Sequence, residues 1–485
     1  MLLCDRVVFQ NFKPRHIGSE DNVTEHQDLL KPLAARVYSL AVGRAIFNYG
    51  TSSKPSNNPF DIPELVCAAK IPPLYNTVTY DVSTLPANYL NWPEFHNGVA
   101  MGLTLVPQST EVDESWMHYN QPALADPRRL GFLFALALNG HLRKMQPWRA
   151  FSYLSIKEEV TAVSLLLGLS GGMAGSQDEK IKSMLAVHIS PLKPPQTMDC
   201  VIEGTIQAAA LLGMGLLYQG SVNRQLAEML LQEIGRREFS STAATAPNRE
   251  AYSLSAGLAL GLVTLGKGEE ALGFKDMHVV DELRKFMFGG LQSSLIFHAR
   301  TRQSTPEDKS HVAVAYMENE NINIDVTAPG ATLALALMYL KTNTQSIANK
   351  ILIPDTIFNL DHVRPDFLLL RILSRNLIMW DNICPTEEWI MSQVPQLIKE
   401  KMGISMRAAG RASPILSAIP TMDEDERKDS ITHAYYSIIT GACFSIGFKY
   451  AGSLDERVLE FLLLKYDLFL GRISVPGTAL FSLFG

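Results

Sequence analysis

A helix-length apolar segment with several small residues places the strongest constraint on how this chain folds. Residues Arg249–Gly268 read REAYSLSAGLALGLVTLGKG, with Gly257 and Gly261 in the middle. A glycine inside a helix costs about 1 kcal/mol relative to alanine. We therefore expect a second helix to approach closely at Gly257 and Gly261. We also expect Gly266 to end the helix in the left-handed conformation, which glycine adopts without steric cost.

The same pattern recurs along the chain, which predicts a repeat protein. The related segments are His96–Pro107, Arg129–Leu142, Thr161–Gly172, Gly204–Gly220, Pro329–Lys341 and Ala434–Ser453. Together with the first segment they align on a late small residue, and the last segment carries a further small residue at Gly441. The aligned residues are Gly102, Ala135, Gly168, Gly215, Gly261, Ala336 and Gly447. In four segments a glycine follows five positions later, at the place of a helix C-cap: Gly140, Gly220, Gly266 and Gly452.

The spacing of these segments predicts pairs of helices. The first two intervals between aligned residues are 33 residues, the period of a two-helix repeat. The last two intervals are 75 and 111 residues, near two and three times 37, which predicts hidden units at Met287–Phe297 and Phe367–Trp380. The fold class is therefore all-α, with α/α helical-hairpin repeats stacked as a solenoid.

Composition changes along the chain predict its division into regions. Seven prolines between residues 51 and 93 forbid a long helix there, and NTVTYDV at Asn76–Val82 reads as an edge strand. A helix is expected at His26–Tyr49, and a polar loop with a block of acids at Ala408–Ser430. The predicted regions are 1–50 (N-terminal segment and end of a preceding helical region), 51–93 (proline-rich connector), 94–275 (first repeat block), 276–325 (insertion or diverged repeat), 326–470 (second repeat block with the loop 408–430) and 471–485 (divergent tail).

Composition also argues against several classes of partner. The net charge is −6, and no basic stripe dominates, so nucleic acid is not expected as a partner. The five cysteines are scattered and never form a C-x-x-C pair, which argues against disulfides and zinc and for a reducing, intracellular compartment. The longest apolar runs are about a dozen residues, short of the roughly 20 that cross a membrane.

Three glycine-rich motifs resemble catalytic signatures but lack an essential part of each. Gly261–Lys267 matches most of a P-loop, but Gly268 stands where magnesium coordination needs serine or threonine. Gly213–Tyr218 resembles a dinucleotide fingerprint with a tyrosine in place of its third glycine. Gly168–Gly172 fits a nucleophile elbow around Ser170, but a helix precedes it where a strand is required. All three are better explained as parts of repeat helices.

The titratable residues form no catalytic constellation in the sequence. His96, His141 and His433 lie at repeat boundaries and are expected to pack or cap helices. Glu158–Glu159 reads as a helix start, and Asp423–Glu426 lies in the predicted acidic loop, which is either a solvated loop or a phosphorylatable linker. The sequence thus predicts no catalytic residue, no cofactor-binding residue and no metal ligand.

The repeats resemble the proteasome/cyclosome repeats. These are shared by the two large non-ATPase base subunits of the proteasome regulatory particle and by the family of the largest subunit of the anaphase-promoting complex. The likeness covers roughly Asp28–Ser453 and is closer to the latter family. The segments that carry it are LAVGRAIF (Leu40–Phe47), FHNGVAMGL (Phe95–Leu103), ALNGHL (Ala137–Leu142), SLLLGLS (Ser164–Ser170), LYQGS (Leu217–Ser221), REAYSLSAGLALG (Arg249–Gly261), DVTAPGATLALALMYLKTN (Asp325–Asn343), FLLLRILSRNLIMWDNI (Phe367–Ile383) and GACFSIGFKYAGS (Gly441–Ser453).

This resemblance implies a curved or toroidal ring of paired helices in a cell-cycle ubiquitin ligase. It implies a non-catalytic scaffold that contacts the cullin-like and RING-bearing catalytic module, the co-activator, the small substrate-recruiting subunit and the TPR subunits. It implies no cofactor and no small-molecule substrate, and a location in nucleus and cytoplasm. Two alternatives remain at this point: a proteasome base subunit with the same repeats, and an α/α-toroid hydrolase, which would need paired carboxylates at a cavity mouth.

The resemblance also implies a length difference. Family members are much longer, so the chain is expected to be a fragment, a truncated isoform or an incomplete gene model. A ring without its last units would expose an apolar helix face near Phe461–Leu470. Poor solubility of the chain expressed alone is the expected consequence.

Overall fold

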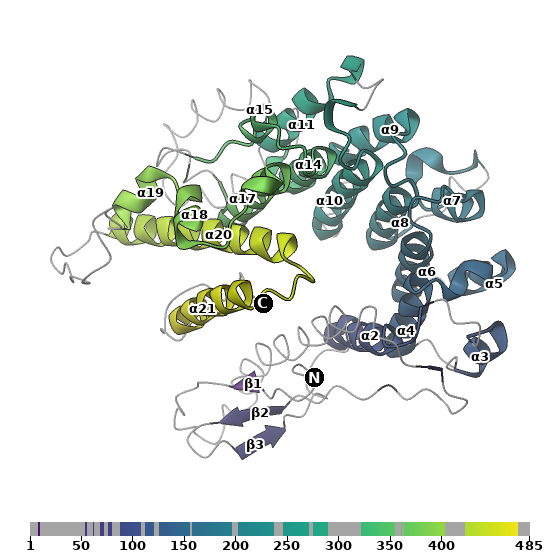
Figure 1. Ribbon diagram of the computed structural model, residues 1–485. Helices are drawn as coiled ribbons and strands as arrows, with labels where there is room; N and C mark the ends of the chain where they lie inside the picture. The colour runs from purple at the N-terminus through teal and green to yellow at the C-terminus, as the bar shows by residue number, and fades with distance from the viewer. Residues whose placement is uncertain are drawn as a thin grey trace. The chain divides into compact units, whose positions relative to one another are not determined.

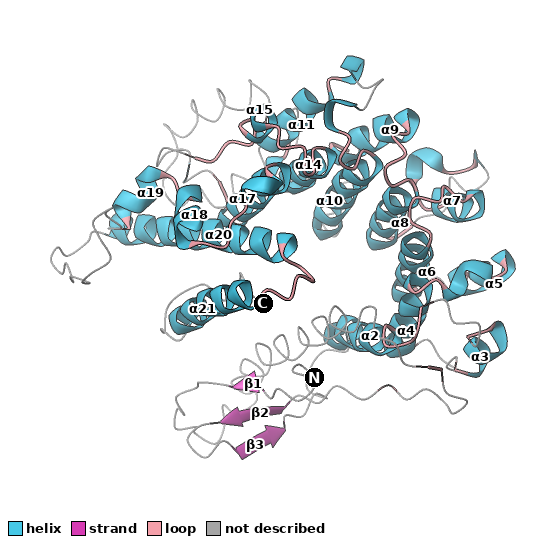
Figure 2. Cartoon of the chain, viewed as in Figure 1, coloured by secondary structure: helices cyan, strands magenta, loops and turns pink. Residues whose placement is uncertain are grey.

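The described residues lie mostly in helices (Figures 1 and 2). The chain divides into two units. The computed structural model describes residues 8–9, 54–55, 62, 68–71, 76–79, 88–107, 112–120, 126–155, 158–195, 202–236, 246–270, 275–289, 322–354, 360, 363–402 and 422–473. Unit 1 is Met1–Tyr218 with Phe484–Gly485, and unit 2 is Gln219–Leu483. Within the described ranges, no helix has the length and apolar character needed to cross a membrane. The helix predicted at His26–Tyr49 lies outside the described residues.

Unit 1 begins with a small sheet and continues with paired helices. Its strands are β1 (Val8–Phe9), β2 (Ala68–Ile71) and β3 (Asn76–Thr79), where β1 pairs parallel with β2 and β2 pairs antiparallel with β3. The edge strand predicted at Asn76–Val82 is therefore β3. The helices are α2 (Asn88–Gly102), α3 (Glu114–Tyr119), α4 (Pro127–Leu138), α5 (Pro147–Leu154), α6 (Glu159–Gly172), α7 (Glu179–Ala186) and α8 (Gly204–Leu217).

Four of these helices form a row in which each packs on the next, and we call them the inner helices of unit 1. They are α2, α4, α6 and α8, whereas α5 and α7 pack beside the row as outer helices. The inner helices carry the small-residue segments predicted from the sequence. Gly98 of α2 faces Arg128 and Gly102 faces Ala135 of α4, so the two helices run parallel.

Unit 2 repeats the same arrangement. Its inner helices are α10 (Ala246–Val263), α14 (Ile324–Met338), α17 (Pro365–Ile378) and α20 (Met422–Lys449), packed in that order. The remaining helices are α9 (Arg224–Ile234), α11 (Val279–Phe288), α15 (Gln345–Ala348), α18 (Glu387–Gln393), α19 (Gln396–Lys401) and α21 (Glu456–Ile473). The fold is thus all-α and built from α/α repeats, as the sequence predicts.

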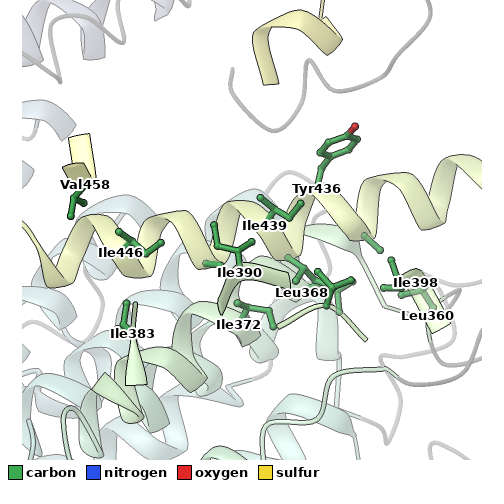
Figure 3. Close-up of a cluster of buried hydrophobic side chains, with 14 residues drawn as sticks. Leu360, Leu368, Ile372, Ile383, Ile390, Ile398, Tyr436, Ile439, Ile446 and Val458 are labelled. Carbon is green, nitrogen blue, oxygen red and sulfur yellow. The ribbon is translucent and has the colours of Figure 1, made fainter. Parts of the chain in front are cut away.

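The core of unit 2 is aliphatic where α17 and α20 meet (Figure 3). Leu368 and Ile372 of α17 lie against the row of Ile439 and Ile446 on α20, and Ile390 of α18 covers them. All of these side chains are at most 3% exposed. Burial of each isoleucine or leucine contributes about 1.5–3 kcal/mol.

One of the two hidden units predicted from the long intervals lies within the described residues. α17 covers Phe367–Ile378 and is an inner helix, which confirms the unit predicted at Phe367–Trp380. α10 and α14 pack directly on each other, so the described residues show no inner helix between them. The unit predicted at Met287–Phe297 falls largely outside the described residues. Met287 and Phe288 end α11, and residues 290–297 lie outside the described part.

The loop predicted at Ala408–Ser430 is also partly wrong. α20 begins at Met422, so residues 422–430 are helical, whereas residues 408–421 are not described. Two physical reasons favour helix here. No proline occurs between Pro420 and the end of α20, and the sequence places the acids Asp423–Glu426 near the N-terminal end of the helix, where acidic residues are favoured.

Substitution of Gly257 tests the close approach of inner helices. A Cβ atom at Gly257 of α10 would lie 2.2 Å from the carbonyl oxygen of Gly330 in α14. Backbone cannot yield to it as a flexible side chain can. We expect Gly257→Leu to lower the free energy of unfolding by about 1–3 kcal/mol or more, and Gly261→Leu to act in the same direction. Urea unfolding followed by far-ultraviolet circular dichroism measures the change.

Gly447 of α20 supplies the matched control in the same unit. A Cβ atom there meets no heavy atom within 4 Å. Gly447→Ala should therefore leave stability unchanged or raise it by up to about 1 kcal/mol through helix propensity. Equal losses in Gly257→Ala and Gly447→Ala would contradict the close-approach assignment.

Candidate functional site

The candidate site of this fold is the contact between successive inner helices, which we call the joint. At the joint lies a turn in which two residues adopt the left-handed backbone conformation. Gly220 and Val222, in the turn before α9, have φ angles of 68° and 55°. Their backbone N–H groups donate to the carbonyl oxygens of Leu262 and Val263 at the end of α10, at 2.9 and 3.1 Å. These carbonyls lie in the last turn of the helix, where no donor four residues later is left within the helix, and that of Leu262 also accepts from the Leu265 N–H at 3.2 Å. We call this arrangement the latch turn.

The latch turn recurs in both units. In unit 1, Gly175 and Gln177 donate to Leu216 and Leu217 of α8, at 3.0 and 3.1 Å. In unit 2, Lys341 and Asn343 donate to Leu377 and Ile378 of α17, at 3.0 and 2.9 Å, and Gly266 alone donates to Leu337 of α14 at 2.9 Å. All seven donors have positive φ. Each latch turn thus caps a neighbouring inner helix and fixes its register at the same time.

An outer helix begins directly after most latch turns. The residue that follows the second left-handed position is Asp178, Asn223 or Thr344, and each is the N-cap of the next outer helix. The Asp178 carboxylate accepts from the N–H groups of Lys180 and Ile181, and the Asn223 side chain accepts from that of Leu226. One four-residue motif therefore ends one helix, caps its neighbour and starts the next helix.

In places without a latch turn, side chains donate hydrogen bonds to the backbone carbonyl groups of a neighbouring repeat. The Arg143 guanidinium donates to the carbonyl oxygen of Gly172 at the end of α6, from Nε at 3.3 Å and from Nη2 at 3.0 Å. The Asn139 amide donates to the carbonyl oxygen of Leu105 at 3.1 Å. In unit 2, Lys449 Nζ donates to the carbonyl oxygens of Asp381 and Ile383. These donors satisfy carbonyl groups at or just beyond the ends of inner helices.

The aligned small residues lie in the inner helices. A Cβ atom added at Gly261 would lie 2.7 Å from that of Leu337, and one at Gly168 would lie 2.7 Å from that of Ala137. Ala135, Ala336 and Gly215 are buried in α4, α14 and α8. Gly441 would meet the carbonyl oxygen of Leu369. Gly102 faces Ala135, as described above, whereas Gly447 and Gly452 face open space.

The four predicted cap glycines all adopt the left-handed conformation. Gly140, Gly220, Gly266 and Gly452 have φ angles of 82°, 68°, 66° and 74°. Sequence reasoning missed the second left-handed position of each turn, at Gln177, Val222, Gly268, Asn343 and Leu454. Its residue types are too varied to form a pattern. The available signal was the polar cap residue that follows, in GSQD, GSVN, KTNT and GSLD.

The motifs that resemble catalytic signatures are parts of the inner helices and of the turns that follow them. Ser170 is fully buried, and its hydroxyl donates to the carbonyl oxygen of Leu166 at 2.6 Å, so it is not an exposed nucleophile. Gly213 and Gly215 lie within α8, and Gly268 follows a latch glycine. Glu158 is the N-cap residue of α6, and its carboxylate accepts from the Thr161 hydroxyl at 2.5 Å.

The three boundary histidines lie in separate elements. His96 is in α2, His141 opens a short 3-10 helix after α4, and His433 is in α20. Burial lowers the pKa of His96 below its ordinary value. Across the part of the chain that the structure describes, no group of three or more His, Cys, Asp or Glu side chains is placed to hold a metal ion.

A small cavity of about 310 Å³ opens in unit 2 between the ends of α9, α10, α11 and α14. Its lining residues are Gln232, Gly235, Arg249, Phe286, Ile322, Asn323 and Thr327. Thr327 donates to the carbonyl oxygen of Phe286 at 2.7 Å, and Asn323 caps α14. Among the residues that the structure describes, the lining of this cavity contains no carboxylate, thiol or imidazole.

A buried polar cluster beside this cavity joins α9 to α10. The Tyr252 hydroxyl donates to the Glu233 carboxylate, and Arg236 Nη1 lies 3.0 Å from the same carboxylate. Burial, and then the hydrogen bond to Glu233, raise the pKa of Tyr252 well above its ordinary value. The Glu233 carboxylate therefore has partners on both sides and is not buried as an unpaired charge.

Comparison with known proteins gives the family. A family model described as the APC1 fifth domain matches residues 179–480, and one described as the APC1 fourth domain matches residues 1–174. The chain belongs to the anaphase-promoting complex subunit 1 family. It is 40% identical over 475 residues to "Anaphase-promoting complex subunit 1" of Homo sapiens, and 34% identical over 479 residues to that of Arabidopsis thaliana.

A further relative supports the same family. The matched region covers nearly all of this chain but only part of each relative. A protein of Emericella nidulans named "Negative regulator of mitosis" is 33% identical over 459 residues. The chain is covered to 96%, 97% and 94% by the human, Arabidopsis and Emericella proteins. It spans 23%, 27% and 20% of their lengths, about a quarter of each. The match supports the subunit family and gives no support to the proteasome alternative.

Val222 offers a test of the latch turn. A β-branched residue with φ of 55° is strained by roughly 1–2 kcal/mol, whereas asparagine tolerates this conformation. Asn343 already occupies the equivalent place in another latch turn. We expect Val222→Asn to raise the free energy of unfolding by about 1 kcal/mol, because the strain falls and the backbone donor stays. Chemical denaturation measures the change.

Gln177→Asn is the control for this prediction. Gln177 stands at the same position of the latch turn in unit 1 but is not branched at Cβ. A smaller gain is expected there. Destabilisation of the chain by Val222→Asn would show that position 222 is held by its side chain and not by its backbone.

Proposed function

We propose that this chain is part of a non-catalytic scaffold subunit of the anaphase-promoting complex, a cell-cycle ubiquitin ligase. In this role the repeat units hold other subunits in place and perform no chemistry. The family match over nearly the whole chain is the observation that carries the proposal. By the resemblance of its repeats, the partners are the catalytic module with its cullin-like and RING subunits, the co-activator, the substrate-recruiting small subunit and the TPR subunits.

The physical character of the repeats supports a scaffold. The backbone donors of the latch turns and the small residues of the inner helices lie where two inner helices meet. These contacts fix the position of each inner helix along the next one, so the helices resist sliding past each other. Aromatic side chains remain exposed on outer helices, with Trp148 and Phe151 of α5 at 65% and 48%. Rigid arrays with exposed outer surfaces suit simultaneous contact with several subunits. We place this activity in the nucleus and the cytoplasm, where the complex would act.

Affinity purification of the tagged full chain from its own cells tests the proposal. We expect cullin-like, RING and TPR subunits of the anaphase-promoting complex among the recovered proteins. Recovery of proteasomal ATPases without those subunits would contradict the proposal, and so would recovery of no subunit of either assembly.

Two glycine variants provide matched controls for this purification. Gly257→Leu disrupts the contact between α10 and α14 and should reduce recovery of the partners that contact unit 2. Gly447→Ala, at a position where a Cβ atom meets nothing within 4 Å, should leave recovery unchanged. Equal recovery with both variants would mean that the packed repeats of unit 2 are not what the partners recognise.

A further inference from the structure

The outer helix α5 exposes two aromatic side chains on one face. Trp148 and Phe151 are 65% and 48% exposed, and residues three apart in a helix lie on the same side of it. The helix packs on α6 beside the row of inner helices (Figure 1), with Ala150 buried and Tyr153 and Leu154 half-buried. We propose that Trp148 and Phe151 dock an acidic segment of a partner protein, which places an apolar side chain against the two rings. The partner is another subunit of the proposed assembly, so this docking site rests on the proposed scaffold function.

The packing of an outer helix does not require such a pair of rings. The exposed residues of α7 are Glu179, Lys180 and Ser183, and the exposed residues of α9 are also charged or polar. A single exposed apolar side chain is common on protein surfaces, but two large rings side by side form a patch that water solvates poorly. Tryptophan is also enriched among the residues that dominate binding energy. Contact with a partner therefore explains the pair better than folding does.

The charge around α5 indicates the chemistry of the partner. Residues 140–157 contain four cationic side chains and no aspartate or glutamate, whereas the whole chain has a net charge of −6. The four are Arg143, Lys144, Arg149 and Lys157. Arg143 is exposed, and its guanidinium donates to the carbonyl oxygen of Gly172, a neutral group that does not cancel its charge. A segment rich in carboxylates complements this surface, because opposite charges speed the encounter and fix the register of the bound segment.

A short segment fits this surface better than a nucleic acid or an anionic membrane does. Both of those present negative charge over a large area and bind basic surfaces of matching extent. The next outer helix, α7, does not continue the positive charge, because residues 178–186 contain two acids and two lysines, and Glu179 pairs with Lys182. The eight residues of α5 span about 12 Å, which two turns of a partner helix would cover.

Photo-cross-linking in the full chain tests the proposal. A photoreactive phenylalanine analogue replaces Ser152, which is exposed next to Phe151, and the tagged chain is irradiated in its own cells and purified. We expect mass spectrometry to find the cross-link on a segment of another subunit that has an excess of Asp and Glu and an apolar residue among them. The same analogue in place of Ser183, exposed on α7, is the matched control and should not capture that segment.

The outcomes separate this inference from the scaffold function. Recovery of the complex without a cross-link at position 152 would overturn the docking site and leave the scaffold function standing. A cross-link to a segment without net negative charge, to nucleic acid or to lipid would overturn it as well. A cross-link to an acidic segment of a protein outside the complex, with no subunit of the complex recovered, would contradict the scaffold function and support the docking site.

Binding of the captured segment, as a labelled synthetic peptide, to the full chain measures the part played by each ring. Trp148→Ala should weaken binding about 30-fold, the loss that marks a dominant interface residue, and Phe151→Ala should act in the same direction. Leu352→Ala removes a comparably exposed apolar side chain of unit 2 and should leave the affinity unchanged. Added salt should weaken binding, because it screens exposed charges. Unchanged affinity in Trp148→Ala, or an affinity that does not depend on salt, would overturn the proposal.

Discussion

The hydrogen bonds from each latch turn to the end of a neighbouring inner helix are the interaction on which the repeats depend. The last carbonyl groups of a helix have no donor within the helix, and burying them without partners is costly. Here the donors come from the backbone of an adjoining repeat, as when Lys341 and Asn343 cap α17. Two left-handed residues are needed to aim both N–H groups the same way. The cost in backbone strain at Val222 or Gln177 is offset by satisfied helix ends.

The latch turns require the inner helices to lie close together, and the small residues make this possible. At Gly257 the backbone of α14 comes so near that even a methyl group would overlap it. Buried hydroxyl groups are also short side chains that allow a close approach. Thr264, Thr332 and Ser445 donate to carbonyl oxygens four residues earlier in the chain. Ser445 also accepts a hydrogen bond from the Asn376 amide of α17 at 3.1 Å, which links α17 to α20.

Local patterns predicted much of the fold, and tertiary partners decided the rest. Repeated small residues indicated the inner helices, and the glycine five positions later indicated the left-handed caps at Gly140, Gly220, Gly266 and Gly452. Interval lengths could not tell an insertion from a hidden repeat. The unit expected at Phe367–Trp380 is the inner helix α17, whereas α10 and α14 pack directly on each other although the Met287–Phe297 segment lies between them in the chain. The second latch residue escaped prediction because its donor role depends on a carbonyl some 40 residues away, such as Val263 for Val222.

Amide hydrogen exchange, read residue by residue, tests the latch turns most directly. The account predicts slow exchange at Gly175, Gln177, Gly220, Val222, Gly266, Lys341 and Asn343, at rates close to those of the inner helices that they cap. The turn at Gly452 and Leu454 has the same left-handed geometry, but the described part of the chain supplies no acceptor for its N–H groups. It should exchange rapidly in the isolated chain. Rapid exchange at Gly220, Val222, Lys341 and Asn343, as fast as at an exposed loop, would contradict the account.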